Sequence, residues 1–381
     1  MAKAKAAGTR PVDKRVALVL QGGGALGSYQ AGVYDALEEG GYLPDWVAGI
    51  SIGAINAAII AGNAPARRTE QLRAFWEQVS SLSAMWPDLP LHAWQQASRQ
   101  AGALAALVFG QPGFFRPNAV QAWISGRPAT SYYDTSELRG TLERLVDFDR
   151  INAREIRLSV GAVNVRTGNF RYFDNRREPI RPEHVMASGA LPPGFPGIEI
   201  EGELYWDGGL VSNTPLQHVL DDYPRESTLA FQVDLFPAQG ALPHDLESVE
   251  ERRKDIQYSS RTRLGVDSFR TAHNMRRAMA RLYARLPPAL RDTPEGLELE
   301  RAACMTSMDV VHLIYRSREA QGAAKDFEFS RATMQARWGQ GLADGMAALT
   351  AAPWLAPASP EIAVRTFDVR HAAEPRAGGP A

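Results

Sequence analysis

Two glycine-bracketed turns near the N-terminus carry the residues best suited to chemistry. In the second turn, Gly49-Ile50-Ser51-Ile52-Gly53, a serine stands between an apolar run and a stretch of small residues. Gly-x-Ser-x-Gly at a strand–helix junction exposes the serine hydroxyl on a strained turn, and its glycines let strand and helix approach closely. The pattern predicts Ser51 as a nucleophile, the Ile52 N–H as an oxyanion donor, and Gly49 and Gly53 as structural support.

The first turn, Gln21-Gly22-Gly23-Gly24-Ala25-Leu26-Gly27, is suited to binding an anion. Three consecutive residues without Cβ can direct successive N–H groups toward one point. We therefore predict Gly22, Gly23 and Gly24 as the oxyanion hole, supported by Gly27. The alternative is a tight turn that needs glycine only for packing.

The same loop also satisfies Gly-x-Gly-x-x-Gly, the dinucleotide-binding pattern. That pattern expects an acidic residue at the end of the second strand, about 20 residues further on. Asp45 has a suitable spacing but precedes the second expected strand, which ends in Gly49-Ile50-Ser51. The sequence therefore disfavours nucleotide binding.

The base that would activate Ser51 is less well defined. In an α/β-hydrolase, several strands precede the serine, and an Asp and a His follow it. Here one strand–helix unit precedes Ser51, so a Ser–Asp pair is the alternative, with Asp207 of Tyr205-Trp206-Asp207-Gly208-Gly209 as the candidate. Partial burial would raise the basicity of Asp207, although Asp-Gly-Gly is also a common turn. His184 and His218 are the histidines nearest these motifs, and a structural role is favoured for both.

The elements that must position these residues follow from apolar patterns. Continuous apolar runs predict buried strands at 15–20 and 46–50. Helical spacing predicts helices at 28–39, 52–61 and 68–80. Further strands are expected at 157–165, 170–173, 203–206 and 228–235, and alternation in the last predicts a half-buried or edge strand. Long helical stretches follow at 245–286 and 327–349.

Four ordered motifs resemble those of patatin-like phospholipases. They are the Gly22–Gly24 loop, the Ser51 turn, Ala187-Ser188-Gly189-Ala190-Leu191-Pro192-Pro193, and Asp207-Gly208-Gly209. The resemblance covers roughly residues 15–235 and implies a three-layer α/β/α fold. It also implies a catalytic Ser51–Asp207 dyad without histidine, with Gly208 and Gly209 supporting the aspartate. From the residues alone, the Ala187–Pro193 segment is predicted to be a rigid structural support, with direct substrate contact as the alternative.

One position departs from the family pattern. Many patatin-like proteins carry Arg or Lys where this chain has Leu26, which weakens the inference to phospholipid but not to acyl hydrolysis. Residues 236–370 resemble the C-terminal extension of a bacterial subgroup, notably at Asp326-Phe327-Glu328-Phe329-Ser330-Arg331.

Composition sets the broad class. The 381 residues are 45% apolar and 22% charged, with a formal net charge of −1, which gives no general attraction to nucleic acid. We expect a flexible basic tail at 1–14, a catalytic domain at 15–240, a mostly helical extension at 241–370, and a disordered tail at 371–381. The single cysteine, Cys304, fits a reducing compartment and a cytoplasmic location. No histidine has metal-ligand spacing, and we expect neither a metal nor an organic cofactor.

Two segments are candidates for contact with a lipid substrate or a membrane. Residues 84–117 are rich in Trp, Leu and Phe, which suits a cap over an acyl pocket or an ordinary packed excursion. Residues 261–286 form a basic amphipathic helix that suits peripheral contact with an anionic membrane or packing on the core.

The sequence thus predicts a serine acyl hydrolase that cleaves lipid esters; the alternative is a patatin-fold binding or regulatory module. Phospholipid, neutral lipid, short ester and polyester oligomer are not distinguished, nor is the oligomeric state.

Overall fold

A computed structural model describes residues 12–81, 108–118, 129–259, 262–317, 322, 324–359 and 361–368. The tail predicted at 371–381 lies outside these residues, as does most of the tail predicted at 1–14. The cap predicted at 84–117 is described only from residue 108 onward.

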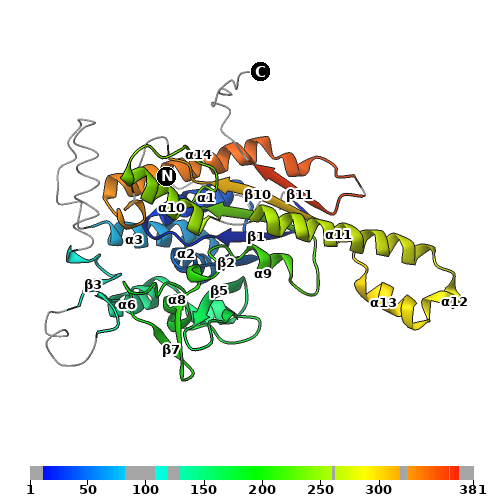
Figure 1. Ribbon diagram of the computed structural model, residues 1–381, viewed down its shortest axis with the longest axis horizontal. Coiled ribbons are helices and arrows are strands. Elements are labelled where there is room, and N and C mark those ends of the chain that lie inside the picture. Colours follow the sequence, from blue (N-terminus) through cyan, green and yellow to red (C-terminus); the bar gives the residue numbers. More distant parts are fainter. Residues whose placement is uncertain are drawn as a thin grey trace, which may run out of the picture.

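A mostly parallel sheet forms the centre of the molecule (Figure 1). Within the described residues its order is β11-β10-β9-β1-β2-β5-β8-β7, and β6 pairs with β5. The parallel strands are β1 Arg15–Leu20, β2 Trp46–Gly49, β5 Arg157–Asn164, β9 Thr228–Asp234, β10 Met308–Ile314 and β11 Val364–Asp368. The antiparallel strands are β6 Phe170–Asp174, β7 Ile198–Ile200 and β8 Glu203–Asp207.

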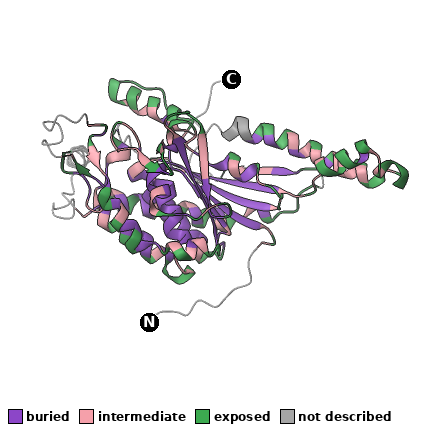
Figure 2. Ribbon diagram, turned by 90° about the horizontal axis from the view of Figure 1, so that it is seen from below, coloured by how far each residue is buried: buried purple, intermediate pink, exposed green. Residues whose placement is uncertain are grey.

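Helices cover both faces of this sheet. Even-numbered residues of β1, such as Leu18, join the core formed with α1 (Ser28–Glu39) and α2 (Ile52–Ala61). Odd-numbered residues, such as Val19, join a second core with α9 (Leu216–Leu220). Figure 2 shows the buried strands between exposed helical surfaces. The predicted three-layer α/β/α fold is confirmed.

The remaining helical elements and short strands connect these layers. The helices are α3 Arg68–Val79, α6 Ser136–Leu145, α7 Phe148–Asn152, α8 Pro182–Ser188, α10 Leu246–Tyr258, α11 Thr262–Arg285, α12 Pro288–Arg291, α13 Pro294–Ala302 and α14 Arg331–Ala351. The 3₁₀ turns are η1 Gly24–Gly27, η2 Pro65–Arg67, η4 Gly208–Leu210, η5 Lys325–Phe327 and η6 Pro353–Leu355. A two-stranded ribbon pairs β3 Arg116–Pro117 with β4 Tyr133–Asp134.

The part of the chain beyond residue 240 is mostly helical, as predicted, and it also completes the central sheet. Strand β10 pairs in parallel with β9, and β11 pairs with β10. Helix α14 packs so closely on α1 that a Cβ at Gly32 would lie 2.0 Å from the carbonyl oxygen of Trp338. The domain boundary near residue 240 stays a prediction, but strands on both sides of it belong to one sheet.

The prediction of a half-buried or edge position for 228–235 is wrong. Every residue of β9 is buried. Strands β1 and β10 pair with its two edges, and its two faces lie in the two hydrophobic cores. Its polar residues are accommodated by local partners: Gln232 Nε2 donates to Asp234 Oδ2 at 2.7 Å, and Thr228 Oγ1 accepts from Arg15 Nε at 3.2 Å.

Helix α11 is only partly packed on the core. Near its start, Val266 and Phe269 are buried in the core shared with α9. Further along, Met275 and Leu282 are each 57% exposed, where α11 extends with α12 and α13 away from the sheet (Figures 1 and 2). In the described part of the chain, no helix is both long and apolar enough to cross a membrane.

Candidate active site

The predicted nucleophile lies on a strained turn between β2 and α2. Ser51 has φ 55° and ψ −124°, a conformation that is costly for a residue with a side chain. Both flanking glycines are required by close packing. A Cβ at Gly49 would lie 2.2 Å from the carbonyl oxygen of Gly53, and a Cβ at Gly53 would lie 2.4 Å from that of Leu20. The turn therefore has the geometry expected of a nucleophile elbow.

The Ala187–Pro193 segment supports this turn through hydrogen bonds. The amide of Ser51 donates to the backbone oxygen of Ser188 at 3.1 Å and to its hydroxyl at 3.0 Å. The Ser188 hydroxyl in turn donates to the Gly161 carbonyl on β5 at 2.7 Å. Gly189 and Leu191 of the same segment line the cleft above Ser51. The segment thus has the supporting contacts predicted for it and also forms part of the cleft wall.

Asp207 ends strand β8 beside the serine. Its backbone N–H donates to the Ala190 carbonyl at 3.0 Å, and its Oδ1 accepts from the Gly209 amide at 2.7 Å. Ser51 and Asp207 line the same cleft, and the Ser51 side chain is near enough to lower the pKa of this carboxylate. Serine and aspartate come from sequence positions far apart, and the sheet brings them together because β8 lies next to β5, which pairs with β2.

Burial controls the acidity of this carboxylate. Asp207 is only 2% exposed, and loss of hydration raises its pKa to about 7, against the opposing hydrogen bonds from Gly209 and Ser51. An aspartate with a pKa near 7 is a stronger base than a solvated one and is still ionised in part at neutral pH. The site thus holds a serine hydroxyl beside a carboxylate of raised basicity.

The glycine loop lies directly against Ser51. A Cβ at Gly22 would lie 3.0 Å from the Ser51 Cβ and 2.4 Å from Asn213 Oδ1. Asn213 clamps this residue, because its carbonyl accepts from the Gly22 amide at 3.1 Å and its Nδ2 donates to the Gly22 carbonyl at 3.0 Å. Asn213 follows the Asp207-Gly208-Gly209 turn without a motif of its own, so sequence reasoning missed it.

The amides of the loop are not equivalent. That of Gly22 is engaged by Asn213. By contrast, the amides of Gly23, Gly24 and Ile52 donate to no protein acceptor within the described residues. Gly24 has φ +55°, which favours glycine, and a Cβ there would lie 2.3 Å from the Asp326 carbonyl. Three free N–H groups therefore remain beside the serine.

The side chain at position 26 does not face this cleft. Leu26 is completely buried in the core around α1 and α2 and is absent from the cleft lining. The position at which the family often has a cation is here part of the apolar packing.

A mostly apolar cleft opens above these groups. Its lining is mostly apolar with a few polar groups, which is typical of small-molecule sites. Ser51, Asp207 and the three glycines of the loop are at its base. Its walls are formed by Ile52, Ile55, Phe114, Phe115, Leu191, Phe195, Phe236, Tyr258, Phe327 and Phe329. Such a lining suits an apolar group attached to a polar reacting centre.

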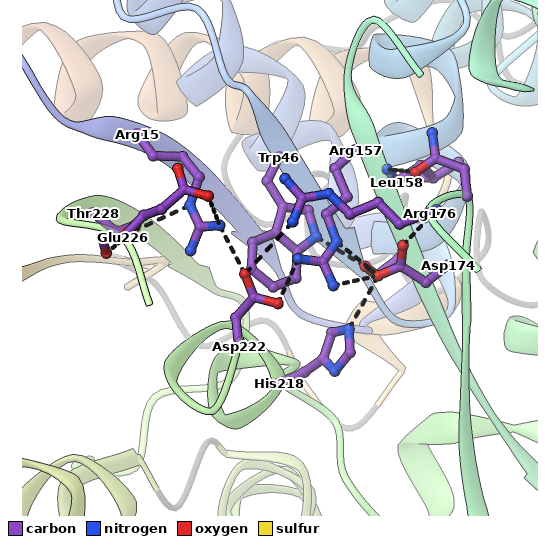
Figure 3. Close-up of polar contacts among 12 residues, drawn as sticks. Arg15, Trp46, Arg157, Leu158, Asp174, Arg176, His218, Asp222, Glu226 and Thr228 are labelled. Carbon is purple, nitrogen blue, oxygen red and sulfur yellow. Dashed lines mark hydrogen bonds and ion pairs between the residues drawn. The ribbon is translucent and has the colours of Figure 1, made fainter. Parts of the chain in front are cut away.

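The histidines near the motifs lie elsewhere. His184 accepts the Arg181 amide on Nδ1 at 2.9 Å, and burial lowers its pKa to about 4. His218 stacks on Tyr172 with 3.9 Å between ring centroids, and its Nε2 lies 3.5 Å from Asp174 Oδ2 (Figure 3). Neither histidine lines the cleft.

Asp45, the acid considered for nucleotide binding, lies away from the glycine loop. Asp45 accepts the Val16 amide at 2.7 Å at the start of β1, the opposite end of this strand from the glycine loop. A dinucleotide ribose would require an acid at the other end. Among the described residues no cluster of His, Cys, Asp or Glu could hold a metal ion, and Cys304 is a free thiol outside the cleft.

Comparison with known proteins decides the family. A family model described as patatin-like phospholipase matches residues 18–220, more than half of the chain. The chain belongs to the patatin-like phospholipase family. A second model, described as patatin phospholipase, matches residues 256–361, so both the N-terminal and the C-terminal parts of this patatin-like protein have family relatives.

Curated relatives match over a short region. The patatin-like phospholipase domain-containing protein 6 of Homo sapiens and that of Mus musculus are each 45% identical over 76 residues. The match covers 20% of this patatin-like chain and only 6% of the length of those relatives.

Solved structures resemble it at low identity. VipD from Legionella pneumophila is 16% identical, with a TM-score of 0.39, over 89% of this chain and 67% of that one. Human GIVD cytosolic phospholipase A2 is 14% identical, with a TM-score of 0.30, over 57% of this chain and 43% of that one.

Proposed function

We propose that this protein is a serine acyl hydrolase that cleaves carboxylic esters of lipids through a Ser51–Asp207 dyad. The observation that carries the proposal is that Ser51, on its strained turn, and the buried carboxylate of Asp207 line one cleft, close enough for the Ser51 hydroxyl to affect the Asp207 pKa. Membership of the patatin-like phospholipase family supports lipid hydrolysis as the reaction class. The apolar walls of the cleft support an acyl chain as the bound group.

Acylation comes first in the proposed mechanism. As Ser51 Oγ bonds to the carbonyl carbon of the ester, Asp207 accepts the hydroxyl proton. The tetrahedral intermediate carries an oxyanion, which in this proposal accepts hydrogen bonds from the amides of Gly23, Gly24 and Ile52; these amides have no acceptor among the described residues. In this conformation Gly22 contributes close backbone approach rather than its amide. The C–O bond then breaks, and the proton passes from Asp207 to the departing alkoxide, leaving an acyl-enzyme.

Deacylation repeats these steps with water. Asp207 accepts a proton from the water that attacks the acyl carbon, and the same amides stabilise the second oxyanion. The ester bond to Ser51 breaks, the serine recovers its proton from Asp207, and a free carboxylic acid leaves. None of these steps requires a metal or an organic cofactor.

Covalent labelling tests this proposal against a binding or regulatory module. A fluorophosphonate probe should label the wild type and should not label Ser51→Ala, and hydrolysis of p-nitrophenyl esters should be lost in parallel. Ser136→Ala, an exposed serine on α6, is the matched control and should label as the wild type does. Unlabelled wild-type protein that hydrolyses no ester would contradict the proposal.

The cellular setting belongs to the same proposal. We place the activity in the cytoplasm, with peripheral contact to membranes through the basic helix α11, whose exposed apolar residues include Met275 and Leu282. Flotation with anionic and with neutral liposomes checks this contact. Binding to the anionic liposomes alone is the expected result, and binding to neither would remove the membrane contact from the proposal.

A further inference from the structure

One wall of the cleft comes from a short segment far along the chain. We call Lys325–Phe329 the strap; it consists of the 3₁₀ turn η5 and the two residues after it. Asp326, Phe327 and Phe329 of the strap line the same cleft as Ser51 and Asp207. The strap is part of the region matched by the second family model rather than the first.

The strap touches the glycine loop through its backbone. A Cβ at Gly24 would lie 2.3 Å from the carbonyl oxygen of Asp326, so the backbones of the strap and the glycine loop are in direct contact. On its other side the loop packs against Leu235 and Phe236, because a Cβ at Gly23 would lie 2.7 Å from Leu235 Cδ1. Any displacement of the strap would therefore change the surroundings of the Gly24 amide.

Ion pairs fix the strap to α10. Lys254 Nζ lies 2.7 Å from Asp326 Oδ1, and Lys325 Nζ lies 2.5 Å from Asp255 Oδ1 and 3.2 Å from Glu251 Oε1. The Lys325 side chain is only 6% exposed, so its pair with Asp255 is largely shielded from solvent.

Further hydrogen bonds hold the strap and connect α10 to the residues beside the glycine loop. Arg337 of α14 donates to the backbone carbonyls of Lys325 and Glu328, at 2.9 and 3.0 Å. At the end of α10, the Tyr258 carbonyl accepts from Gln21 and Asn213, each at 3.0 Å. The same helix thus holds both the strap and the residues that flank the glycine loop.

The aromatic side chains of the strap form the apolar wall. The Phe329 ring lies 6.1 Å from that of Phe114 and 6.3 Å from that of Phe115, measured between centroids. Phe327 is half-buried in the cleft lining, with Lys254 Nζ 5.3 Å from its ring centroid. Lys254 therefore makes two contacts with the strap, an ion pair with Asp326 and a cation–π contact with the Phe327 ring.

We propose, building on the hydrolase function above, that the strap determines which acyl group the enzyme accepts. Phe327 and Phe329 form the wall that an uncharged, apolar acyl chain meets, and they limit its length. Lys254 is a positioning residue that holds this wall, together with the Asp326 carbonyl, against the glycine loop. The substrate class is an ester whose acyl part is a linear hydrocarbon chain.

Acyl-chain selectivity tests the wall directly. The readout is the ratio of kcat/KM for p-nitrophenyl decanoate to that for p-nitrophenyl acetate. Phe327→Ala should raise this ratio about tenfold or more, since an altered apolar contact of this size changes discrimination by that order. Phe329→Leu, which keeps the site apolar and filled, should raise it less. A ratio within twofold of the wild type in both variants would overturn the proposal.

A matched pair of charge deletions tests the positioning role. Lys254→Met should change the ratio at least threefold and slow fluorophosphonate labelling. Arg253→Met removes a neighbouring charge on α10 that is paired within the helix to Glu250, and it should leave both readouts unchanged. Equal effects of the two variants, or none from Lys254→Met in folded protein, would exclude the positioning role. The hydrolase function is tested separately by probe labelling and ester hydrolysis of the wild type, because neither result depends on the ratio of the two kcat/KM values.

Discussion

The two ends of the central sheet each bury an aspartate, and they treat it in opposite ways. At the carboxyl ends of the parallel strands, Asp207 has no cation beside it in the described structure, and burial raises its pKa to about 7. At the other end, burial alone would also raise the pKa of Asp174, but His218, Arg157 and the Arg176 amide bond to it and hold the pKa well below its usual range (Figure 3).

At the end of the sheet that holds Asp174, positive and negative side chains alternate in a row. We call this row the ladder; it consists of Arg15, Asp222, Arg157 and Asp174. The guanidinium nitrogen and carboxylate oxygen of each successive pair lie 2.8, 2.6 and 2.7 Å apart. The Arg157 guanidinium also lies 3.7 Å from the Trp46 ring centroid.

The difference shows what decides the role of a buried carboxylate. Desolvation raises the pKa of both carboxylates, so the neighbouring groups determine whether the final pKa lies above or below the usual value. Fixed cations keep Asp174 ionised and hold the strand starts together. A neutral hydroxyl and an amide leave Asp207 with a basicity suited to proton transfer.

The largest expected effect comes from replacing Asp207 with its amide. Asp207→Asn keeps the shape but cannot accept a proton from Ser51, so ester hydrolysis should fall by about 10²–10⁴-fold. The measurement is kcat/KM on p-nitrophenyl esters with folding checked by circular dichroism. A folded variant with full activity would remove Asp207 from the mechanism.

The same change in the ladder should affect stability instead. Asp174→Asn leaves Arg157 with one buried carboxylate partner fewer, and the free energy of unfolding should fall by about 3–5 kcal/mol. Urea denaturation measures this loss. As a control, Arg166→Ala breaks an exposed pair with Glu203 and should change stability little. If Asp174→Asn were as harmless as Arg166→Ala, the contrast between the two ends would fail.

The pH dependence of stability should distinguish the ends further. The Asp207 pKa is about 7 in the folded protein and near 4 when unfolded, so its protonated form favours folding at low pH. That contribution is lost as pH rises from about 4 through 7. Relative to the wild type, Asp207→Asn should therefore gain on the order of 2 kcal/mol between pH 5 and pH 8. A difference between variant and wild type that does not change with pH would contradict the raised pKa.

The smallest effect is the position of the acidic limb of activity. Because only ionised Asp207 accepts the serine proton, kcat/KM should decline below a pKa of about 7, tenfold per pH unit well below it. Initial rates between pH 5 and 9 give this limb. A limb near pH 4 would mean that Asp207 behaves as a solvated aspartate.

Local patterns predicted the elements that carry the chemistry. Helix α2 begins and ends at the predicted residues, and strand β1 does so as well, because short apolar runs and glycine stops are local signals. The motifs likewise identified Ser51 and Asp207, which the fold then brings together.

What the sequence could not predict depends on distant pairing. Strand β9 is a central strand only because it pairs with β10, about 80 residues later in the chain, and its two faces are covered by the two cores. Asn213 has no motif, and the resemblance noted at Asp326–Arg331 gave the strap no role; only the folded chain shows that both contact the glycine loop. Arg15 and Arg157 each begin a buried strand, a weak signal of the ladder that requires Asp174 and Asp222 to interpret.

The contact between Asp326 and Gly24 has a consequence for synthesis of the protein. A ribosome makes the nucleophile, the aspartate and the glycine loop well before it reaches residue 326. Until the strap and then α14 have emerged, one side of the loop is uncovered and one wall of the cleft is missing. The order of residues along the chain thus delays completion of the proposed lipid-cleaving site until late in translation.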